Sequence, residues 1–253
     1  MLTLKLIGIG TGNPEHLTLQ AIRELRACDL ILIPQKGEEK GELAQLRRDI
    51  CKTHLAGTTR LVAFDMPERD PAIASYRERV ERWHDAIAAR WMDAITAHGA
   101  EHASVGLLVW GDPSLFDSTI RIADRLAARI DMQVVVIPGI TALQGLTAAH
   151  GIPINEIGEA FVVTTGRKLR EDGWPAGADT VAIMLDGECS FQSVEPAGVT
   201  IWWGAYVGMP QEITLSGPLA ELREDIVDAR GQARAQHGWI MDSYVLKRHA
   251  AGK

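Results

Sequence analysis

The chain has 253 residues, of which 46% are hydrophobic and 23% charged, and its formal net charge is −7. This composition is typical of a globular protein that buries its own core, and the length suits one large domain or two small ones. Proteins that bind duplex nucleic acid usually concentrate positive charge, so an acidic chain makes such a partner unfavourable.

Cysteine usage and hydropathy indicate the compartment. Cys28, Cys51 and Cys189 lie far apart, without a CxxC pair, so we expect neither a disulfide framework nor a cysteine-built metal site. The N-terminus MLTLKLIGIG lacks the cleavage region of a signal peptide, and no apolar run approaches the roughly 20 residues that a bilayer requires. We therefore expect a cytoplasmic protein with no membrane partner.

The first elements predict a β-α-β unit. Leu2 to Ile9 is rich in Leu and Ile and stops at glycines, as a buried strand does. Helical spacing begins near Leu17, and the strand Leu30 to Ile33 ends at Pro34. The charged segment Gln35 to Lys40 is interpreted as either a mobile loop or a lid.

A long amphipathic helix is predicted over Tyr76 to Ile95. Its apolar stripe consists of Tyr76, Val80, Trp83, Ile87, Trp91 and Ile95. A stripe of this kind is more often core packing than a ligand shelf.

Strands and helices then alternate. We predict strands at Ser104 to Trp110 and Gln133 to Ile137, and helices at Ser118 to Ile130 and Ile140 to Ala149. Repeated alternation predicts a parallel α/β sheet with helices on its faces.

The pattern changes after Ile152-Pro153. Fewer and shorter helices are expected between four predicted strands, at Phe161 to Thr164, Thr180 to Leu185, Val199 to Trp203 and Tyr244 to Lys247. This favours a second, mixed sheet, and thus two α/β domains covering residues 1–155 and 156–253.

Three glycine loops follow predicted strands: Gly8-Ile9-Gly10-Thr11-Gly12, Trp110-Gly111-Asp112-Pro113-Ser114-Leu115-Phe116 and Pro138-Gly139-Ile140-Thr141-Ala142. The first does not match the dinucleotide fingerprint GxGxxG, and the second strand ends without the carboxylate that would hold a ribose. Asp112 is interpreted either as a helix cap or as a ligand contact, and Thr141 as the N-cap of the helix that follows it. Because open α/β sheets bind ligands at the carboxyl ends of their strands, we expect the three loops to form one site.

GIGTGNPEHLT at 8 to 18, WGDPSLF at 110 to 116 and PGITALQ at 138 to 144, in this order and spacing, resemble the tetrapyrrole methylase family. The resemblance extends to VGMPQE and GPLAEL near the carboxyl terminus, so it covers essentially the whole chain. The stretches PQKGEEK, WHDAIAARW, VWGDPSLFDSTIRI and TTGRKL resemble the branch that methylates a corrin-precursor ring with loss of an acetyl group. Other corrin-ring methylases of the family, and a non-catalytic cofactor-binding homologue, remain open alternatives.

The resemblance implies a two-domain methyltransferase, commonly a homodimer, that uses S-adenosylmethionine, releases S-adenosylhomocysteine and needs no metal. The cofactor is expected in a cleft between the domains, and the substrate is a corrin precursor rich in carboxylates. Carried over by motif, the cofactor contacts are Pro14, Gly111, Asp112, Pro113, Thr141, Ala142, Met184 and Tyr206. At Tyr206 the sequence departs from the small residue usual in the family.

Few catalytic side chains are expected, because a sulfonium donor is already activated and needs mainly alignment. If an acetyl group is removed, a base is useful, and Asp112 is the candidate. Further candidate substrate contacts are Ser114 and the basic residues Arg167, Lys168 and Arg170. Two other features are interpreted as structural: the arginine stripe Arg121, Arg125 and Arg129 as a solvated helix face, and His84 and His150 as packing residues.

Overall fold

A computed structural model describes residues 1–35, 41–55 and 57–249. The chain folds into two compact units, Met1–Ile140 and Thr141 onward. This division falls before α5 (Ala142–His150), whereas we predicted a boundary between residues 155 and 156. The difference arises because α5 contacts β8, β9 and β10 of the second sheet, a choice of partner that helical periodicity does not encode. Residues 36–40 of the loop or lid lie outside the described residues.

The first unit contains a five-stranded sheet in the order β3-β2-β4-β1-β5. Its strands are β1 (Leu2–Gly8), β2 (Leu30–Gln35), β3 (Arg60–Asp65), β4 (Ser104–Val109) and β5 (Met132–Ile137). Every pairing is parallel, which confirms the predicted sheet. We did not predict β3 or α2 (Gly41–His54); as an edge strand β3 buries only Phe64, so its pattern is weak.

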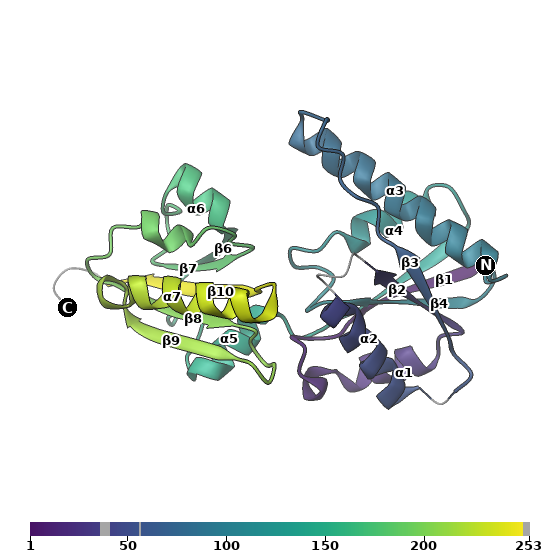
Figure 1. Ribbon diagram of the computed structural model, residues 1–253, viewed down its shortest axis with the longest axis horizontal. Coiled ribbons are helices and arrows are strands. Elements are labelled where there is room, and N and C mark those ends of the chain that lie inside the picture. Colours follow the sequence, from purple (N-terminus) through teal and green to yellow (C-terminus); the bar gives the residue numbers. More distant parts are fainter. Residues whose placement is uncertain (36–40, 56, 250–253) are drawn as a thin grey trace. The chain divides into compact units, whose positions relative to one another are not determined.

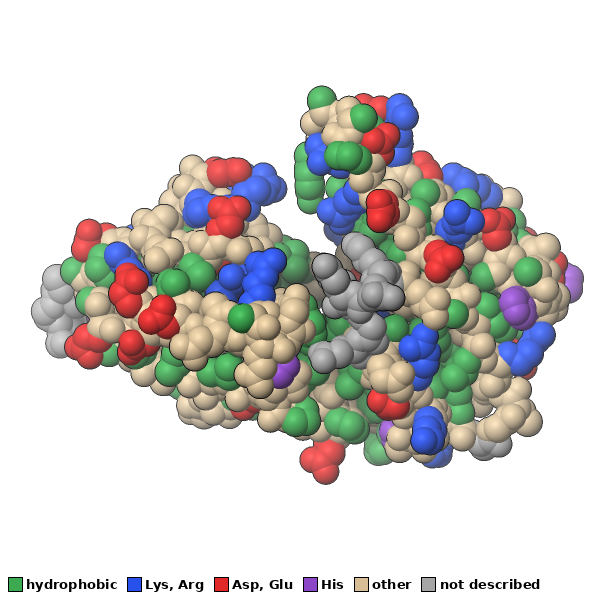
Figure 2. Space-filling model, in the orientation of Figure 1, with side chains coloured by type: hydrophobic (Ala, Val, Ile, Leu, Met, Phe, Trp, Pro, Cys, Tyr) green, Lys and Arg blue, Asp and Glu red, His purple; other side chains and the backbone are tan. Residues whose placement is uncertain are grey.

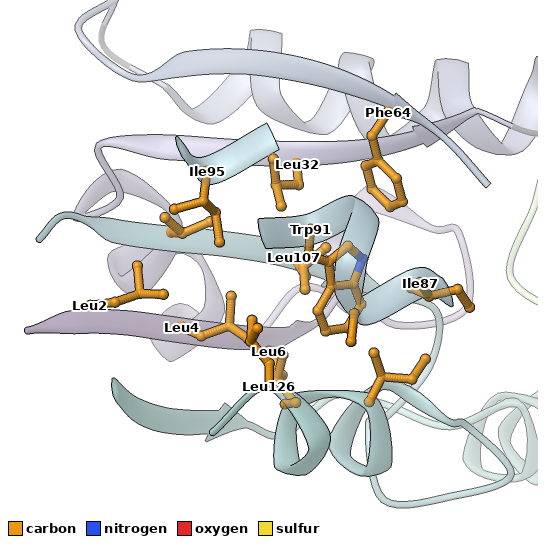
Figure 3. Close-up of a cluster of buried hydrophobic side chains, with 14 of the residues drawn as sticks. Leu2, Leu4, Leu6, Leu32, Phe64, Ile87, Trp91, Ile95, Leu107 and Leu126 are labelled. Carbon is orange, nitrogen blue, oxygen red and sulfur yellow. The ribbon is translucent and has the colours of Figure 1, made fainter. Parts of the chain in front are cut away.

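Helices cover both faces of this sheet (Figure 1). One face carries α1 (Leu19–Arg26) and α2, and the other carries α3 (Tyr76–Ala97) and α4 (Thr119–Ala127). Because side chains alternate along a strand, Leu2, Leu4 and Leu6 of β1 join the core under α3 and α4, whereas Ile7 joins the core under α1 and α2. Figure 3 shows part of the core beneath α3, including Ile87, Trp91 and Ile95.

The stripe on α3 is core packing over its second half, as predicted. Ile87, Trp91 and Ile95 are buried, but Tyr76 at the beginning of the helix is 63% exposed. The helix therefore extends beyond the sheet that it covers, and periodicity alone does not show where its buried portion begins.

The second unit contains a five-stranded mixed sheet in the order β6-β7-β10-β8-β9. Its strands are β6 (Phe161–Thr165), β7 (Thr180–Met184), β8 (Val199–Ala205), β9 (Ile213–Pro218) and β10 (Asp242–Arg248). The β6–β7 pairing is parallel and the other pairings are antiparallel, which confirms the mixed sheet. β9, which contains Gly217 and Pro218, was not predicted.

Two further helices pack on this sheet, α6 (Gly166–Asp172) and α7 (Leu219–His237). The expectation of only short helices was wrong for α7, which has 19 residues. Its buried side chains are few, namely Leu219, Ile226, Arg230 and Ala233, so its hydrophobic stripe is sparse in the sequence.

Acidic and basic side chains are interspersed over each unit on the face shown in Figure 2. The arginine stripe agrees with the expected solvated face, because Arg121 and Arg129 are exposed. Arg125 on α4 and Arg129 just beyond its end also donate to Asp85 of α3, each at 3.0 Å. Within the described residues, no helix combines the length and apolar character needed to cross a membrane.

Candidate functional site

The three glycine loops of the first unit meet at one edge of the sheet. Because β4, β1 and β5 are adjacent and parallel, their carboxyl ends lie together. A Cβ built on Gly139 would lie 2.0 Å from the carbonyl oxygen of Gly111, and one built on Gly8 would lie 2.6 Å from the amide nitrogen of Gly139. These neighbours are backbone atoms, which cannot rotate away, so the junction admits no side chain at either position.

Gly10 and Gly111 connect two of the loops by a pair of backbone hydrogen bonds. The amide of Gly111 donates to the Gly10 carbonyl at 2.8 Å, and the amide of Gly10 donates back at 3.3 Å. Both residues have positive φ angles, 74° and 65°, which favour glycine. Backbone conformation and close approach together account for the glycine-rich pattern, and we call Gly8, Gly10, Gly111 and Gly139 the glycine junction.

Asp112 connects the second loop to the third. Its Oδ2 accepts from the Gly139 amide at 2.8 Å, and its Oδ1 accepts from the amide and hydroxyl of Ser114 at 2.8 and 2.5 Å. It is not the cap of α4, because Thr119 at the beginning of that helix donates to Asp117 instead. Burial acts to raise the pKa of Asp112, but the hydrogen bonds from Ser114 and Gly139 outweigh it and hold the pKa below its ordinary value. Asp112 is therefore a carboxylate at neutral pH.

The second loop also exposes Phe116, which sequence reasoning missed. Phe116 has a φ of 50°, a left-handed conformation that is unusual for an aromatic residue, and its side chain is 41% exposed. Ser114 is exposed beside it, and Pro113 is buried. Strained backbone and exposed apolar surface are typical of ligand-binding loops. Neither hydrophobicity nor motif spacing signals this conformation.

The first loop continues into a short helical turn, η1 (Pro14–His16). Asn13 caps this turn by accepting from the Glu15 amide at 2.9 Å, and Pro14, the predicted cofactor contact, is exposed. Thr11 and His16 are joined by a 2.7 Å hydrogen bond between Oγ1 and Nδ1. The loop is thus ordered by its own side chains.

In the second unit, Thr141 is the N-cap of α5, as predicted. Its hydroxyl accepts from the Gln144 amide, and the Gln144 side chain accepts from the Thr141 amide at 2.9 Å, which completes a capping box. Ala142 is the first residue of the helix. Their backbone groups belong to a helix N-terminus, where the dipole favours electron-rich ligand groups.

Met184 lies at the end of β7 and is partly buried. The next residue, Leu185, has a φ of 54° and is 65% exposed. Leu185 in the second unit and Phe116 in the first unit therefore have two features in common, a left-handed backbone conformation and an exposed apolar side chain.

Tyr206 is 1% exposed and its side chain packs inside the second unit. Its hydroxyl donates to the Trp239 carbonyl at 2.5 Å, and its ring meets the Trp239 ring edge-on at 5.0 Å between centroids. The φ of Tyr206 is 50°. Any cofactor contact at this position therefore falls to the backbone, and the predicted role of Tyr206 stays a prediction.

Asp186 forms a buried polar cluster that sequence reasoning missed. Its carboxylate accepts from Tyr244 at 2.7 Å, and from the amide and hydroxyl of Ser190 at 2.6 Å each. Burial acts to raise its pKa, but the hydrogen bonds from Ser190 and Tyr244 outweigh it and lower the pKa. Arg230 donates to the Asp186 carbonyl at 2.9 Å and to Asp242 at 3.0 Å. A cluster with its donors and acceptors paired in this way rigidifies the segment that follows β7.

The three basic residues predicted to bind substrate lie on α6, directly after β6. Arg167 and Lys168 form exposed ion pairs with Glu171 and Asp172 at 3.2 and 2.8 Å. Such pairs contribute only about 0.3–0.5 kcal/mol, so a ligand carboxylate can replace the partner. Arg170 is held more firmly, by Asp186 at 3.5 Å and by Glu188 at 3.2 Å.

Metal-binding geometry is not found in the described part of the chain, where no three His, Cys, Asp or Glu side chains are grouped to hold an ion. His150 bonds the Trp203 carbonyl at 3.0 Å, in keeping with its predicted structural role.

Comparisons with known proteins identify the family of this chain. Residues 3–223 match the family model of the tetrapyrrole (corrin/porphyrin) methylases. The chain is similar to precorrin-6A synthase [deacetylating] of Sinorhizobium sp, with 46% identity over 99% of this chain and 97% of that protein.

Two solved structures are also similar. A putative cobalamin synthesis related protein (CobF) from Corynebacterium diphtheriae is 41% identical, with a TM-score of 0.83 over 98% of this chain and 99% of the other. Uroporphyrin-III C-methyltransferase from Thermus thermophilus, complexed with S-adenyl homocysteine, is 20% identical over 97% of each chain, with a TM-score of 0.60. The second likeness shows the fold alone.

Proposed function

The chain belongs to the tetrapyrrole (corrin/porphyrin) methylases, and we propose that within this family it is a precorrin-6A synthase of the deacetylating type. The reaction is methylation of C-1 of precorrin-5 with loss of acetate, which gives precorrin-6A in cobalamin biosynthesis. The observation that carries this choice is the 46% identity to a precorrin-6A synthase, spread over nearly the full length of both chains.

Tetrapyrrole methylases use S-adenosylmethionine, which supplies an activated methyl group, and the described residues suit this donor. The glycine junction presents bare backbone to a ligand, and the ionised Asp112 matches a positively charged one. Asp112 keeps acceptor capacity beyond its three protein hydrogen bonds, because a carboxylate offers about four lone-pair sites. We propose that Pro14, Gly111, Asp112 and Pro113 contact the cofactor, together with Thr141, Ala142, Met184 and the backbone of Tyr206, and that S-adenosylhomocysteine is released without help from a metal.

Methyl transfer requires alignment more than proton transfer, which agrees with a site built mainly from backbone. Loss of acetate requires water to attack the acetyl carbonyl, and Asp112 remains the candidate base. A base with a lowered pKa accepts a proton weakly, so the same geometry favours a positioning role for Asp112. The pH dependence of the rate distinguishes a base from a positioning residue. If Asp112 is the base, the wild-type rate rises as its carboxyl group ionises. If Asp112 only positions ligands, the Asp112→Asn variant is slower but has the same pH dependence as the wild type.

The substrate is a polycarboxylate, and we propose that Ser114 and the α6 residues Arg167, Lys168 and Arg170 bind it. Ser114 is exposed next to Asp112, and the ion pairs of Arg167 and Lys168 are weak enough to exchange. We also propose a homodimer in the cytoplasm, which the family resemblance and three free thiols support. Light scattering on purified protein tests the dimer.

The decisive experiment incubates the protein with isotopically labelled S-adenosylmethionine and individual precorrins. Precorrin-5 should gain one methyl group and release one equivalent of acetate. Methylation without acetate release would indicate another corrin-ring methylase of the family. Cofactor binding by calorimetry without turnover of any precorrin would indicate a non-catalytic homologue.

A further inference from the structure

A cavity of about 180 Å³ lies in the first unit beside the second loop. Its walls are mainly aromatic and aliphatic, and they include Phe64, Trp83, Trp91 and Trp110. Among the described residues, the cation that lines it is Arg47 of α2, and Asp117, just before α4, lines it as well. Pockets for whole drug-sized ligands are roughly 300–1,000 Å³, so this cavity suits a small molecule or a single arm of a large one.

Arg47 is placed by a defect in the sheet. Carbonyls of β4 point alternately to its two neighbours: Ser104 accepts from Asp29 on the β2 side at 2.8 Å, and Val109 accepts from Ile9 on the β1 side at 2.9 Å. The carbonyl of Leu108 therefore faces β2, where the pairing stops at Leu32–Leu107. Continued in register, the ladder would require an amide from Pro34, and proline has none. Nε of Arg47 donates to this carbonyl at 3.0 Å instead.

The guanidinium keeps unused donors. Nη1 donates to the Leu43 carbonyl at 3.0 Å, and no described carboxylate lies within ion-pair distance of Arg47. Burial is the main influence on Arg47 and lowers its pKa to about 10, against the opposing charge of Asp117. A guanidinium has five N–H donors, and the two hydrogen bonds to Leu108 and Leu43 leave donors on Arg47 that can bind an anion. A desolvated cation without an ion-pair partner gains strongly when a carboxylate reaches it.

Two further groups point to a ligand. The indole nitrogen of Trp91 is buried and has no hydrogen-bond partner among the described residues, and Trp91, which is 3% exposed, lines the cavity. Figure 3 shows Trp91 among Phe64, Ile87 and Leu107, which line the same cavity. The N-terminus of α4 opens there as well, through Ser118 and Thr119, and its dipole favours negative charge. Asp117 opposes an anion, but its carboxylate is occupied in capping Thr119 at 2.6 Å.

We propose that this cavity binds a carboxylate carried on a short aliphatic arm, with Arg47 as its counter-ion and Trp91 as an additional donor. The arm packs against the aromatic walls while the carboxylate reaches the guanidinium. This inference rests on the proposed function only for the source of the ligand, which is either a side-chain acid of the ring substrate or the acetate that the reaction releases.

The test uses the whole protein without substrate. Sodium propionate and sodium acetate are titrated at constant ionic strength against sodium chloride, and the indole N–H resonance of Trp91, assigned with Trp91→Phe, is followed by NMR. We expect a saturable shift with the carboxylates. Arg47→Gln should weaken binding roughly tenfold or more, since a charge-assisted hydrogen bond is lost.

Matched variants separate binding from folding. Arg48→Gln, the next residue on α2 and not part of the cavity wall, should leave the titration unchanged. Asp117→Asn keeps an acceptor for the α4 cap but removes the opposing charge, so it should bind the carboxylates more tightly. If Arg47→Gln does not fold, Arg47→Lys retains charge without the fork, and weaker binding with near-native melting supports the proposal. A non-saturable titration, or one that is identical in the folded Arg47 variants, would overturn it.

Kinetics then identify the source. Propionate that competes with the ring substrate indicates a ring side chain in the cavity, whereas inhibition by acetate that persists at saturating ring substrate indicates the released product. Because the titrations need no turnover, failure of the proposed activity would leave their outcome intact, and failure of the titrations would leave the activity intact.

Discussion

Gly139→Ala tests the glycine junction by adding one methyl group. The new Cβ would lie 2.0 Å from the Gly111 carbonyl oxygen, and real Cβ contacts essentially never fall under 3.0 Å. The loops must therefore separate by at least about 1 Å, the difference between these two distances. Separation also disrupts the 2.8 Å hydrogen bond from the Gly139 amide to Asp112.

The expected cost has two parts. Overpacking a close-packed region typically destabilises by about 1–3 kcal/mol, so the melting temperature should fall by several degrees. Misplacing reacting groups by about 1 Å reduces rates by about 100-fold, so methylation should fall by that order. Gly139 does not have a positive φ, so alanine introduces no backbone strain and the effect is steric.

Calorimetry with S-adenosylmethionine and thermal unfolding measure these effects. The matched control is Gly231→Ala, because Gly231 lies within α7 and a Cβ there meets nothing within 4 Å. This control should stabilise the protein by about 0.5–1 kcal/mol. Wild-type cofactor affinity and melting in Gly139→Ala would refute the reasoning that backbone packing shapes the site.

Three other predictions concern buried groups. Asp186→Ala should destabilise the second unit by about 3–5 kcal/mol in urea unfolding, because partners of a buried charge are left unpaired; a loss under about 1 kcal/mol would contradict this. The pKa values of Asp186 and Asp112 are lowered, so the folded state binds protons at these carboxylates more weakly than the unfolded state does. The two carboxylates therefore stabilise the fold fully above the unfolded pKa of about 4, and this contribution is lost as the pH falls below that value. Urea midpoints between pH 7 and 3 should therefore decline below about pH 4, and less so in Asp186→Asn. Burial raises the pKa of Cys28 to about 11 and that of Cys51 to about 12, so iodoacetamide at pH 8 should leave both unmodified until the protein unfolds; rapid labelling of either in the native state would be inconsistent with their burial.

Sequence reasoning succeeded where one local pattern sufficed. A run rich in Leu and Ile that stops at glycines predicted β1, and Thr141 was correctly expected to be the N-cap of the helix that became α5. The sequence did not predict β3, because an edge strand with one buried residue has a weak hydrophobic pattern. It did not predict the length of α7 either, because few positions of that helix are buried.

The candidate site was also predicted only in part. The glycine loops and Asp112 could be predicted because three such loops follow strands of one parallel sheet, but the contacts of their atoms could not. Whether Asp112 caps a helix or connects two loops depends on where α4 begins, which Asp117 decides. Tyr206 is a similar case, because its side chain packs against Trp239, and motif spacing does not predict that contact.

The local elements, the parallel character of the first sheet and the family motifs could be inferred from residue order, because they depend on periodicity and on residues near each other in the chain. The loops that touch, the charges that are paired and the donors that remain unused became known from the folded arrangement. Arg47 illustrates the reason: its position depends on the missing amide of Pro34 and on the carbonyl of Leu108, which is far from both in the sequence. Contacts of that kind follow from strand order and register, and no local pattern encodes them.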